Sequence, residues 1–344
     1  MRRKMRIGIV GASGYTGAEL LRLVVGHPDL ELVWATGDTM AGTPVAQLYP
    51  SLGAAYPGLS YSAYEPTAAD GLDAVFLALP HGASQAIVPD LRERVPHLID
   101  LAADFRLRDA SLYPTWYGEA HHCPELLGEF AFGIPELFRP SLVDAPLIAA
   151  AGCYVTAAAL ALAPLIRAGM VEPSGIIVDA ASGVSGAGRK AAESTHFNTV
   201  DENFNAYGLL THRHTPEIEQ AIGAQVLFTP HLAPMNRGIL ATCYARPSTS
   251  TNGGADPDPL AALTDFYGAE PFVVVSERSP STKAALGSNT CHVTARFDPR
   301  TGWIIAIAAL DNLTKGASGQ ALQCANLALG LPETTGLPTI GLMP

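Results

Sequence analysis

The chain has 344 residues, of which 48% are hydrophobic and 15% are charged, and its formal net charge is -11. This length predicts two domains with ample core, and the hydrophobic content excludes a disordered chain. The negative charge argues against a general nucleic-acid-binding protein and against a protein of anionic membrane surfaces, although a few local arginines can still hold an anionic substrate.

Cysteine usage and hydrophobic runs indicate the compartment. The five cysteines are widely spaced and form no C-x-x-C pair, which is typical of a reducing compartment rather than of a disulfide framework. The basic N-terminus is followed by no apolar signal core, and no apolar run reaches membrane-spanning length. We therefore expect a cytoplasmic protein with no membrane segment.

The first predicted elements are a strand over residues 6–10, a glycine-rich turn and a helix over residues 15–25. A strand, a G-x-x-G-x-x-G turn and a helix form the phosphate-binding start of a dinucleotide fold, because small residues let the backbone approach the pyrophosphate. An ordinary strand-helix turn is the alternative. The candidate cofactor-binding residues in this turn are Gly11, Ser13, Gly14, Tyr15, Thr16 and Gly17.

The second predicted strand, residues 31–35, should be followed by a group that contacts the adenosine ribose. Asp38 can accept a hydrogen bond from a ribose 2′-hydroxyl, which favours NAD. Thr36 and Thr39 can instead donate to a 2′-phosphate. No arginine lies in residues 36–42, so NAD and NADP both remain open, and Asp38 can equally be a solvated loop residue.

A buried strand over residues 73–79 precedes Pro80 and His81, and a helix is predicted over residues 83–94. Ligands bind at the carboxyl ends of strands in parallel sheets, so Pro80 and His81 are candidate cofactor neighbours. The alternative for His81 is a helix-entry residue that hydrogen-bonds only to backbone.

The next strand, residues 97–101, precedes Arg106. This guanidinium can grip a phosphate or carboxylate as a bidentate fork, which makes Arg106 a candidate substrate ligand. Its alternative is an ion pair with Asp104 or Asp109.

Residues 113–140 are rich in proline and aromatic residues and predict mostly loops. Within them, residues 121–123 (HHC) are similar to a fragment of a metal site. No second ligand pair stands at finger-like spacing, so we expect a surface loop and no metal.

A small-residue strand over residues 147–151 leads into Gly152, Cys153 and a helix over residues 155–168. Cys153 then lies near the first free amides of that helix, where the helix dipole favours a thiolate, which is a nucleophile. The alternative is an inert core cysteine.

A strand over residues 175–181 leads into a glycine- and serine-rich loop. This loop can present amides to an anion or pass close to a nicotinamide, and a flexible glycine loop is the alternative. Its candidate residues are Ser182, Gly183 and Gly186 for the cofactor and Arg189 for the substrate. Few helices separate the strands predicted after it, which favours a mixed or antiparallel sheet. These strands are predicted over residues 225–230, 237–245, 272–276, 290–297 and 304–310.

His212, Arg213 and His214 crowd the start of a helix whose N-cap and first residue are predicted at Thr215 and Pro216. Positive charge there opposes the helix dipole, and residues that break a local rule without structural gain indicate a site. A neutral histidine near Cys153 can exchange protons near pH 7. Glu217 can orient an imidazole or bind substrate, and a solvated loop is the alternative.

The last predicted helix, residues 321–329, follows Asn312 and Lys315, which are candidate cofactor ligands. Together the pieces suggest a thiolate that attacks an activated acyl group, a nicotinamide that reduces the thioester, and an aldehyde product. With an acyl phosphate as substrate, Arg106, Arg189 or the glycine-serine loop can hold the departing phosphate.

The sequence resembles the N-acetyl-γ-glutamyl-phosphate reductases of arginine biosynthesis, within the semialdehyde dehydrogenase superfamily. The matching motifs run in order along nearly the whole chain. They are residues 11–17 (GASGYTG), 79–82 (LPHG), 103–107 (ADFRL), 152–154 (GCY), 182–189 (SGVSGAGR), 211–217 (THRHTPE), 235–238 (MNRG) and 311–316 (DNLTKG).

The resemblance implies NADP-linked reduction of N-acetylglutamyl phosphate to the semialdehyde. Cys153 matches the nucleophile, His212 is favoured as the acid/base residue, and His214 and Glu217 would position substrate. It also implies a homodimer or homotetramer built through the second domain. The expected fold is a Rossmann-type nucleotide-binding domain, residues 1–152, completed by residues 314–344. An α+β catalytic and oligomerisation domain with a mixed, largely antiparallel sheet would span residues 153–313.

Two departures from the family pattern keep alternatives open. Ala150, Ala151 and Val155 stand where the family usually carries Asn-Pro and Pro. Ala150 and Ala151 before Gly-Cys are similar to reductases of glutamyl or aminoadipyl phosphates attached to a carrier protein, whereas Tyr154 and residues 211–219 favour the free acetylated substrate. Gly37 and Asp38 stand where many relatives carry Ser-Arg, so NAD is not excluded. An alternative of another class is a nucleotide-binding redox sensor without turnover.

Overall fold

The computed structural model describes residues 3–248 and 256–344, and the chain divides into two compact units. The first unit comprises the chain up to Ala151 and returns for Ala317–Leu337, and the second comprises Gly152–Gly316 and Pro338–Pro344. The expected boundaries at 152/153 and 313/314 lie within three residues of these. Residues 338–344, which we expected in the first domain, group with the second unit.

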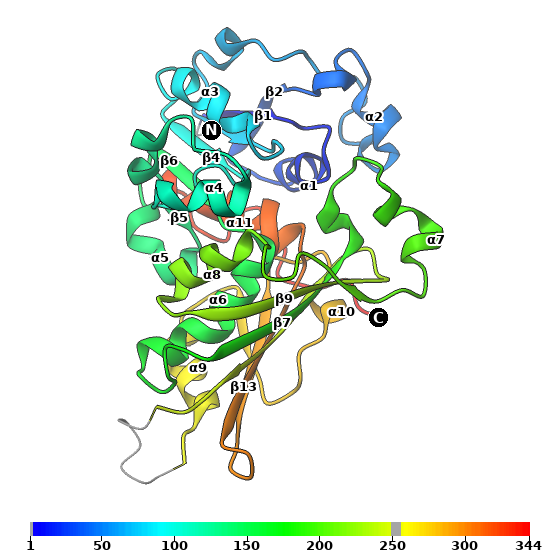
Figure 1. Ribbon diagram of the computed structural model, residues 1–344. Coiled ribbons are helices and arrows are strands. Elements are labelled where there is room, and N and C mark those ends of the chain that lie inside the picture. Colours follow the sequence, from blue (N-terminus) through cyan, green and yellow to red (C-terminus); the bar gives the residue numbers. More distant parts are fainter. Residues whose placement is uncertain (1–2, 249–255) are drawn as a thin grey trace. The chain divides into compact units, whose positions relative to one another are not determined.

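The first unit is built on a parallel six-stranded sheet in the order β2-β1-β3-β4-β6-β5 (Figure 1). Short runs of apolar residues form these strands because both faces of a parallel sheet are covered. The strands are β1 (Met5–Val10), β2 (Leu30–Ala35), β3 (Ala74–Leu77), β4 (His97–Asp100), β5 (Ala131–Gly133) and β6 (Leu147–Ala150). This topology confirms the predicted Rossmann-type domain.

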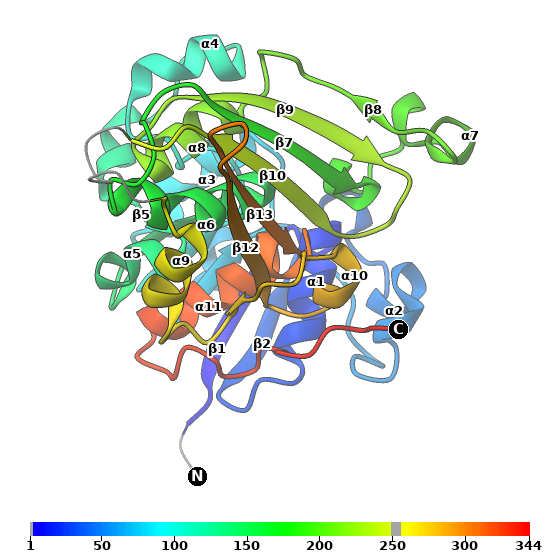
Figure 2. The ribbon, with the colours of Figure 1, turned by 90° about the horizontal axis from the view of Figure 1, so that it is seen from below.

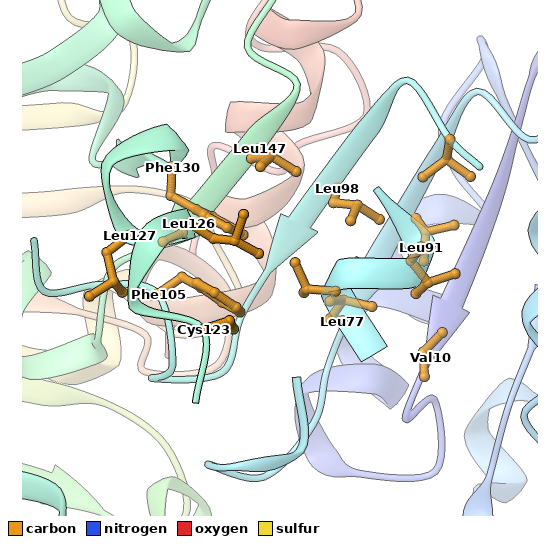
Figure 3. Close-up of a cluster of buried hydrophobic side chains, with 14 of the residues drawn as sticks. Val10, Leu77, Leu91, Leu98, Phe105, Cys123, Leu126, Leu127, Phe130 and Leu147 are labelled. Atoms are coloured by element: carbon orange, nitrogen blue, oxygen red, sulfur yellow. The ribbon is translucent and has the colours of Figure 1, made fainter. Parts of the chain in front are cut away.

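Helices and buried loops cover this sheet. The helices are α1 (Tyr15–Val24), α2 (Val45–Leu48), α3 (Ala83–Leu91), α4 (Tyr113–Tyr117), α5 (Pro135–Leu142) and α11 (Gly319–Ala328). Helix α11 packs on β4, β5 and β6 and against α1 and α5. Figure 3 shows a core in which strand residues such as Leu77 and Leu98 meet Leu91 of α3 and the aromatic pair Phe105 and Phe130.

The prediction of mostly loops over residues 113–140 was wrong. That stretch contains α4, the 3-10 helix Pro124–Glu129, β5 and α5. Strand β5 has three residues and gains its pairing from β6, so no local periodicity announces it.

The second unit is built on a seven-stranded sheet in the order β11-β12-β13-β10-β7-β9-β8. The strands are β7 (Ile176–Gly183), β8 (Asn205–Ala206), β9 (Val226–Ala233), β10 (Ile239–Ala245), β11 (Val273–Val275), β12 (Cys291–Asp298) and β13 (Trp303–Leu310). The pairs β7-β9 and β11-β12 are parallel and the other four are antiparallel. The predicted mixed, largely antiparallel sheet is confirmed.

One face of this sheet carries α6 (Cys153–Arg167), with α8 (His214–Ile222) and α9 (Pro259–Tyr267) packed beside it (Figure 2). Helix α6 is buried on nearly all sides, which explains its continuous run of alanine and leucine. The unit also holds the short helices α7 (Phe197–Val200) and α10 (Thr282–Ala285). Within the described ranges, no helix is long and apolar enough to cross a membrane.

Candidate active site

The glycine turn after β1 allows a close approach of backbone segments. Gly11 has φ +83°, and a Cβ on it would lie 2.4 Å from the carbonyl oxygen of Ala78. A Cβ on Gly17 would lie 2.5 Å from the Cα of Ala12, so neither glycine can carry a side chain without moving backbone. Gly14 is the N-cap of α1, whose first turn holds no acidic residue. The bare backbone and the open helix N-terminus fit a dinucleotide pyrophosphate.

The position of this turn agrees with where such sheets bind ligands. Strand β1 lies between β2 and β3, and the chain crosses first to one side of β1 and then to the other. Ligands bind at such a switch point, outside the carboxyl ends of the strands. The glycine turn follows β1 there, and Pro80 and His81 follow the neighbouring β3.

Hydrogen bonds tie the glycine turn to the loop after β2. The buried Thr36 accepts a hydrogen bond from Gly11 N at its hydroxyl (3.0 Å) and one from Ala12 N at its carbonyl oxygen (2.8 Å). The Ser13 hydroxyl donates to the carbonyl oxygen of Gly37 (3.1 Å). The Thr36 hydroxyl therefore holds the turn in place, whereas Asp38 and Thr39 are exposed beyond it.

His81 is held by a carboxylate rather than by backbone. Its Nδ1 lies 2.5 Å from Asp104, which also accepts hydrogen bonds from Gly82 N and from the Ser84 amide and hydroxyl. Burial opposes ionisation of Asp104, but these hydrogen bonds outweigh it and lower its pKa to about 2. The imidazole also lies against the Tyr117 ring, with centroids 4.5 Å apart. His81 thus has a fixed orientation.

Two residues near Asp104, Arg106 and His121, are buried and hydrogen-bond to backbone carbonyl oxygens. The Arg106 guanidinium is buried and donates to the carbonyl oxygen of Leu101 (2.7 Å). His121 is also buried, its Nε2 lying 2.8 Å from the carbonyl oxygen of Asp104 while its Nδ1 accepts from Cys123 N. Residues 121–123 are therefore part of the core, and the prediction of a surface loop there was wrong for His121 and Cys123.

Cys153 is the first residue of α6, two residues earlier than predicted, and is partly exposed. Gly152, in an extended conformation, is the N-cap, and its amide donates to the carboxylate of Glu217 (2.7 Å). A Cβ on Gly316 would lie 2.8 Å from the Cβ of Cys153, so this glycine gives the cysteine its space. The cysteine is thus fixed where the amides of the first turn favour negative charge.

An aromatic cluster surrounds Tyr154, the residue after Cys153. The Tyr154 ring packs edge-on against His212 (5.7 Å between centroids) and His214 (5.9 Å), and the two imidazoles lie 4.8 Å apart. The Tyr154 hydroxyl donates to the carbonyl oxygen of His231 and accepts from Tyr207. Burial raises the pKa of Tyr207 to about 12, with a smaller contribution from Cys153, so this phenol stays neutral beside the site.

The structure resolves the apparent conflict of charges at the start of α8. The helix begins at His214 rather than at the predicted Pro216, and His214 N donates to Nδ1 of His212 (3.2 Å). Burial, aided by the charge of Arg213, lowers the pKa of His212 to about 4. At neutral pH His212 is uncharged, its Nδ1 accepts and its Nε2 carries the proton, so it does not oppose the helix dipole.

Glu217 lies in the first turn of α8 and is fully buried. Its carboxylate binds the amide that immediately precedes Cys153, as described above. This contact gives Glu217 a role in positioning the nucleophile that the sequence did not indicate.

The glycine-serine loop after β7 is anchored rather than flexible. The buried Asn312 accepts from Gly238 N (2.7 Å) and donates to the Ser185 hydroxyl (2.9 Å). A Cβ on Gly183 would lie 2.7 Å from Arg237 N, so this strand end packs directly on its neighbour. Gly186 is exposed and Arg189 partly so, whereas Ser182 is buried.

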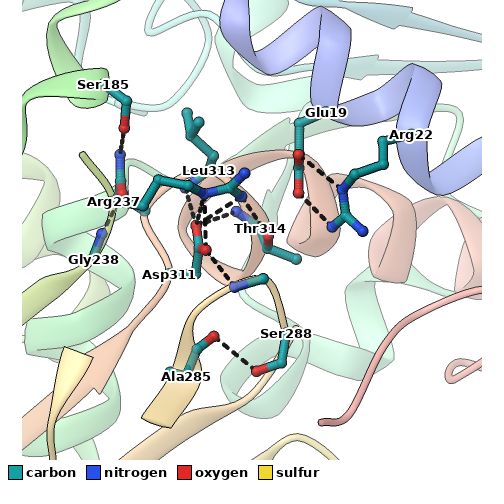
Figure 4. A network of polar contacts seen from close by, with 12 residues as sticks. Glu19, Arg22, Ser185, Arg237, Gly238, Ala285, Ser288, Asp311, Leu313 and Thr314 are labelled. Atoms are coloured by element: carbon teal, nitrogen blue, oxygen red, sulfur yellow. Dashed lines mark hydrogen bonds and ion pairs between the residues drawn. The ribbon is translucent and has the colours of Figure 1, made fainter. Parts of the chain in front are cut away.

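Asp311 ties this region to the segment beside Cys153 (Figure 4). Its buried carboxylate pairs with Arg237 (2.9 Å) and accepts hydrogen bonds from the amides of Gly287, Leu313 and Thr314. A π-helix, Thr314–Ser318, follows and contains Gly316; such turns are frequent at functional sites. Lys315, predicted as a cofactor ligand, is fully buried, with its ammonium 5.7 Å from the centre of the Phe272 ring.

The chain matches two domain families that together span most of its length. Residues 6–145 match the semialdehyde dehydrogenase NAD-binding domain and residues 153–312 match the semialdehyde dehydrogenase dimerisation domain. N-acetyl-γ-glutamyl-phosphate reductases from Desulforudis audaxviator and Symbiobacterium thermophilum are each 47% identical to the chain. Their alignments cover 99% and 98% of this chain and 100% and 98% of those proteins.

The chain belongs to the N-acetyl-γ-glutamyl-phosphate reductase family. Its fold is also similar to aspartate semialdehyde dehydrogenase II of Vibrio cholerae, with a TM-score of 0.70 at 16% identity over 95% of this chain and 99% of the other. The match to the NAD-binding domain supports a nicotinamide cofactor.

Sequence reasoning gave no role to Asp311, Arg237 or Gly316. Asp311, Arg237 and Gly316 lie in motifs shared with the reductase family, MNRG and DNLTKG, which were the available signal. Their contacts join segments tens of residues apart, so only the folded chain assigns them.

Proposed function

We propose that the chain reduces N-acetyl-γ-glutamyl phosphate to N-acetylglutamate 5-semialdehyde and phosphate, the third step of arginine biosynthesis from glutamate. The observation that carries the proposal is Cys153 at the first position of α6, with Gly152 held by Glu217 and with His212 and His214 against Tyr154. The reductase names of the relatives at 47% identity support it.

The first half of the reaction is an acyl transfer to Cys153. Sγ attacks the acyl carbon, the carbon-oxygen bond to phosphate breaks, and the product is a thioester. Cys153 reacts as the thiolate that the first amides of α6 favour, and the proton that its thiol gives up ends on the departing phosphate oxygen, which balances the charge of the leaving group. His212, neutral at pH 7, acts as the acid side of this step by donating a hydrogen bond from Nε2 to the acyl oxygen. Arg189 and Arg106 remain predicted ligands of the phosphate or the substrate carboxylate.

The second half is reduction. A reduced nicotinamide, when bound, supplies the hydride that converts the thioester carbonyl to a tetrahedral oxyanion. The Nε2 proton of His212 stabilises this oxyanion, which collapses to the aldehyde and expels the Cys153 thiolate. His214 orients the His212 imidazole through its backbone N–H, and Glu217 holds the turn before Cys153 through Gly152 N.

We propose that the nicotinamide dinucleotide binds at the glycine turn of the first unit. Gly11, Ser13, Gly14, Tyr15, Thr16 and Gly17 would hold the pyrophosphate, with Thr36, Asp38, Pro80 and His81 at the same sheet edge. The further predicted cofactor residues are Ser182, Gly183, Gly186, Asn312 and Lys315. Asn312 and Lys315 are buried, and Asn312 accepts a hydrogen bond from Gly238, which favours a structural role for these two residues. The resemblance favours NADP(H), with NAD(H) as the alternative that Asp38 raises.

The reverse reaction tests the activity. N-acetylglutamate semialdehyde and phosphate are supplied with NADP or NAD, and nicotinamide reduction is followed. Phosphate-dependent reduction that disappears in Cys153→Ala, while nucleotide binding persists, is the expected result. His212→Asn should lower kcat by roughly 100- to 10,000-fold. No reduction with either nucleotide would favour a carrier-linked substrate, and near-full activity of Cys153→Ala would contradict the thioester route.

A homodimer or homotetramer is proposed through the face of the second sheet opposite α6. Paired residues of β7, β9 and β10 alternate outward there, including Ile177, Leu227 and Tyr244, and Leu227 is 50% exposed. The same face holds a hollow of about 340 Å³ lined partly by Phe204 and His231. Light scattering should give a multiple of the chain mass of 36.0 kDa, and Leu227→Glu should reduce it.

A further inference from the structure

The stretch of chain that contains β2 and the loop after it has no lysine or arginine, the two basic side chains that are always charged at pH 7. This stretch lies between Arg22 and Arg92. The same stretch holds seven carboxylates, at Asp29, Glu31, Asp38, Glu65, Asp70, Asp73 and Asp90. A dinucleotide 2′-phosphate placed beside β2 would meet this stretch of the chain.

The arginines that flank this stretch lie at the opposite edge of the first-unit sheet. Arg22 is in the last turn of α1 and Arg92 follows α3, and both helices run from the carboxyl edge of the strands to the amino edge. Both are paired, Arg22 with Glu19 (2.6 Å) and Arg92 with Glu129 (2.7 Å).

Arg106 follows the carboxyl end of β4, but β1 and β3 separate β4 from β2. With neighbouring strands about 4.8 Å apart, this places the two strands roughly 14 Å from each other. The other arginines and lysines described in the first unit also lie elsewhere: Arg3, Lys4 and Arg6 are at the amino end of β1, Arg108 follows β4 with Arg106, and Arg94 and Arg139 pair with carboxylates. None of these described cations is therefore placed by the fold at the carboxyl end of β2.

Asp38 is fixed at this end of β2. Gly37, before it, donates to the carbonyl oxygen of Ser62 and accepts from Ser13, and a Cβ on Gly37 would lie 2.6 Å from that of Tyr61. Asp38 itself is exposed, begins a 3-10 helix, Asp38–Met40, and has φ +48°. Asparagine and aspartate tolerate this conformation better than other non-glycine residues. The bonds to Ser13 and the Thr36–Gly11 contact set its place relative to the glycine turn.

We propose that Asp38 makes this chain select NAD(H) over NADP(H). Its carboxylate accepts hydrogen bonds from the 2′-hydroxyl of the adenosine ribose and repels a 2′-phosphate, which carries close to two negative charges at pH 7 and finds no cation beside β2. The inference rests on the proposed dinucleotide binding at the glycine turn. It replaces the NADP(H) preference that the family resemblance favours.

Binding of NADH and NADPH to the full-length protein, measured separately by fluorescence titration without substrate, tests this choice. Wild type should bind NADH at least tenfold more tightly than NADPH. Asp38→Asn keeps the size and the backbone preference of the side chain but removes its charge, so it should bind NADPH more tightly and shrink the NADH:NADPH affinity ratio at least fivefold. AMP and 2′-phospho-AMP, titrated in the same way, should show the same pattern.

Glu31→Gln is the matched control, because Glu31 is an exposed carboxylate near the other end of β2 and its loss changes the net charge equally. Its affinity ratio should equal that of wild type, and circular dichroism should show both variants folded. Tighter binding of NADPH by wild type, or an unchanged ratio in Asp38→Asn, would overturn the assignment while leaving dinucleotide binding intact. Binding of neither nucleotide would overturn the proposed cofactor and this inference with it.

Discussion

Helices α1 and α3 begin at the same edge of the first-unit sheet, after the neighbouring strands β1 and β3, yet their N-termini are neutralised differently. At α3, the buried carboxylate of Asp104 accepts hydrogen bonds from Gly82 N, Ser84 N and Gln85 N. At α1, the N-cap is a glycine without a side-chain cap, and the first turn is free of acidic residues. The protein supplies its own anion at the start of α3, whereas the start of α1 is open to the dinucleotide that we propose there.

Helix α6 of the second unit combines both arrangements. The Glu217 carboxylate binds Gly152 N, at the N-cap, and Cys153 occupies the next position. An anion from the chain thus fixes the turn, while the amides of the first helical turn remain for charge that develops on sulfur or substrate. The three helix starts therefore differ: that of α1 is the proposed ligand site, that of α3 is closed by Asp104, and that of α6 holds the proposed nucleophile.

Among the variants considered, Gly17→Ala at the start of α1 should cause the largest loss of nucleotide affinity. Its Cβ would lie 2.5 Å from Ala12 Cα, a backbone atom that cannot move without opening the turn. We expect nucleotide affinity to fall at least 100-fold and the free energy of unfolding to fall by about 2 kcal/mol. Nucleotide titration and urea unfolding measure the two effects.

Gly26→Ala, just beyond the other end of α1, is the control, since its Cβ would meet no atom closer than 3.7 Å. It should change the free energy of unfolding by about 1 kcal/mol or less and leave nucleotide affinity within a few-fold of wild type. Equal losses in the two variants would show that the close approach at Gly17 does not shape the site.

Removing the Asp104 carboxylate that binds the amides at the start of α3 should have the next largest effect, a loss of stability. Asp104→Asn keeps one acceptor but loses the charge that His81, Gly82 and Ser84 surround, so the free energy of unfolding should fall by about 3 kcal/mol near pH 7. Its pKa in the folded state, about 2, lies below the unfolded value. The carboxylate therefore stabilises the protein above about pH 4, and about 2 kcal/mol of this is lost as pH falls from about 4 to about 2.

Urea unfolding at several pH values measures this dependence. The acid-side slope should be shallower in Asp104→Asn than in wild type, whereas Asp265→Asn, a change at an exposed carboxylate of α9, should keep the wild-type slope. Identical slopes in Asp104→Asn and wild type would show that another group causes the loss in acid.

The start of α1 could be predicted from the sequence, whereas the carboxylate contacts at the starts of α3 and α6 could not. The strand, the glycine turn and α1 were predicted because all three are local patterns of apolar runs and glycine spacing. Asp104 was predicted only as a possible partner of Arg106, because its bonds to α3 span about 20 residues and leave no periodicity. The bond between Glu217 and Gly152 spans 65 residues and arises only when α8 packs on α6. Local rules selected Cys153 and the histidines as candidates, but tertiary contacts fix their charge and orientation.

The smallest expected effect on stability is at the start of α6, where a carboxylate of the chain and free helix amides occur together. Glu217→Gln keeps an oxygen that can accept from Gly152 N but removes the negative charge next to the nucleophile. The free energy of unfolding should fall by about 1 kcal/mol, because a charge-assisted bond at a helix N-terminus becomes a neutral one. Iodoacetamide should alkylate Cys153 severalfold faster at pH 6–7, because the thiolate no longer faces that carboxylate.

The reagent is selective in this chain, since Cys123, Cys243, Cys291 and Cys324 are all buried. Glu219→Gln is the matched control: Glu219 lies two residues further along α8 and accepts from Val226 N (3.1 Å) instead. It should leave the alkylation rate at the wild-type value. A slower reaction in Glu217→Gln would mean that the carboxylate helps sulfur only by holding the turn, and α6 would then resemble the closed start of α3 more than the open start of α1.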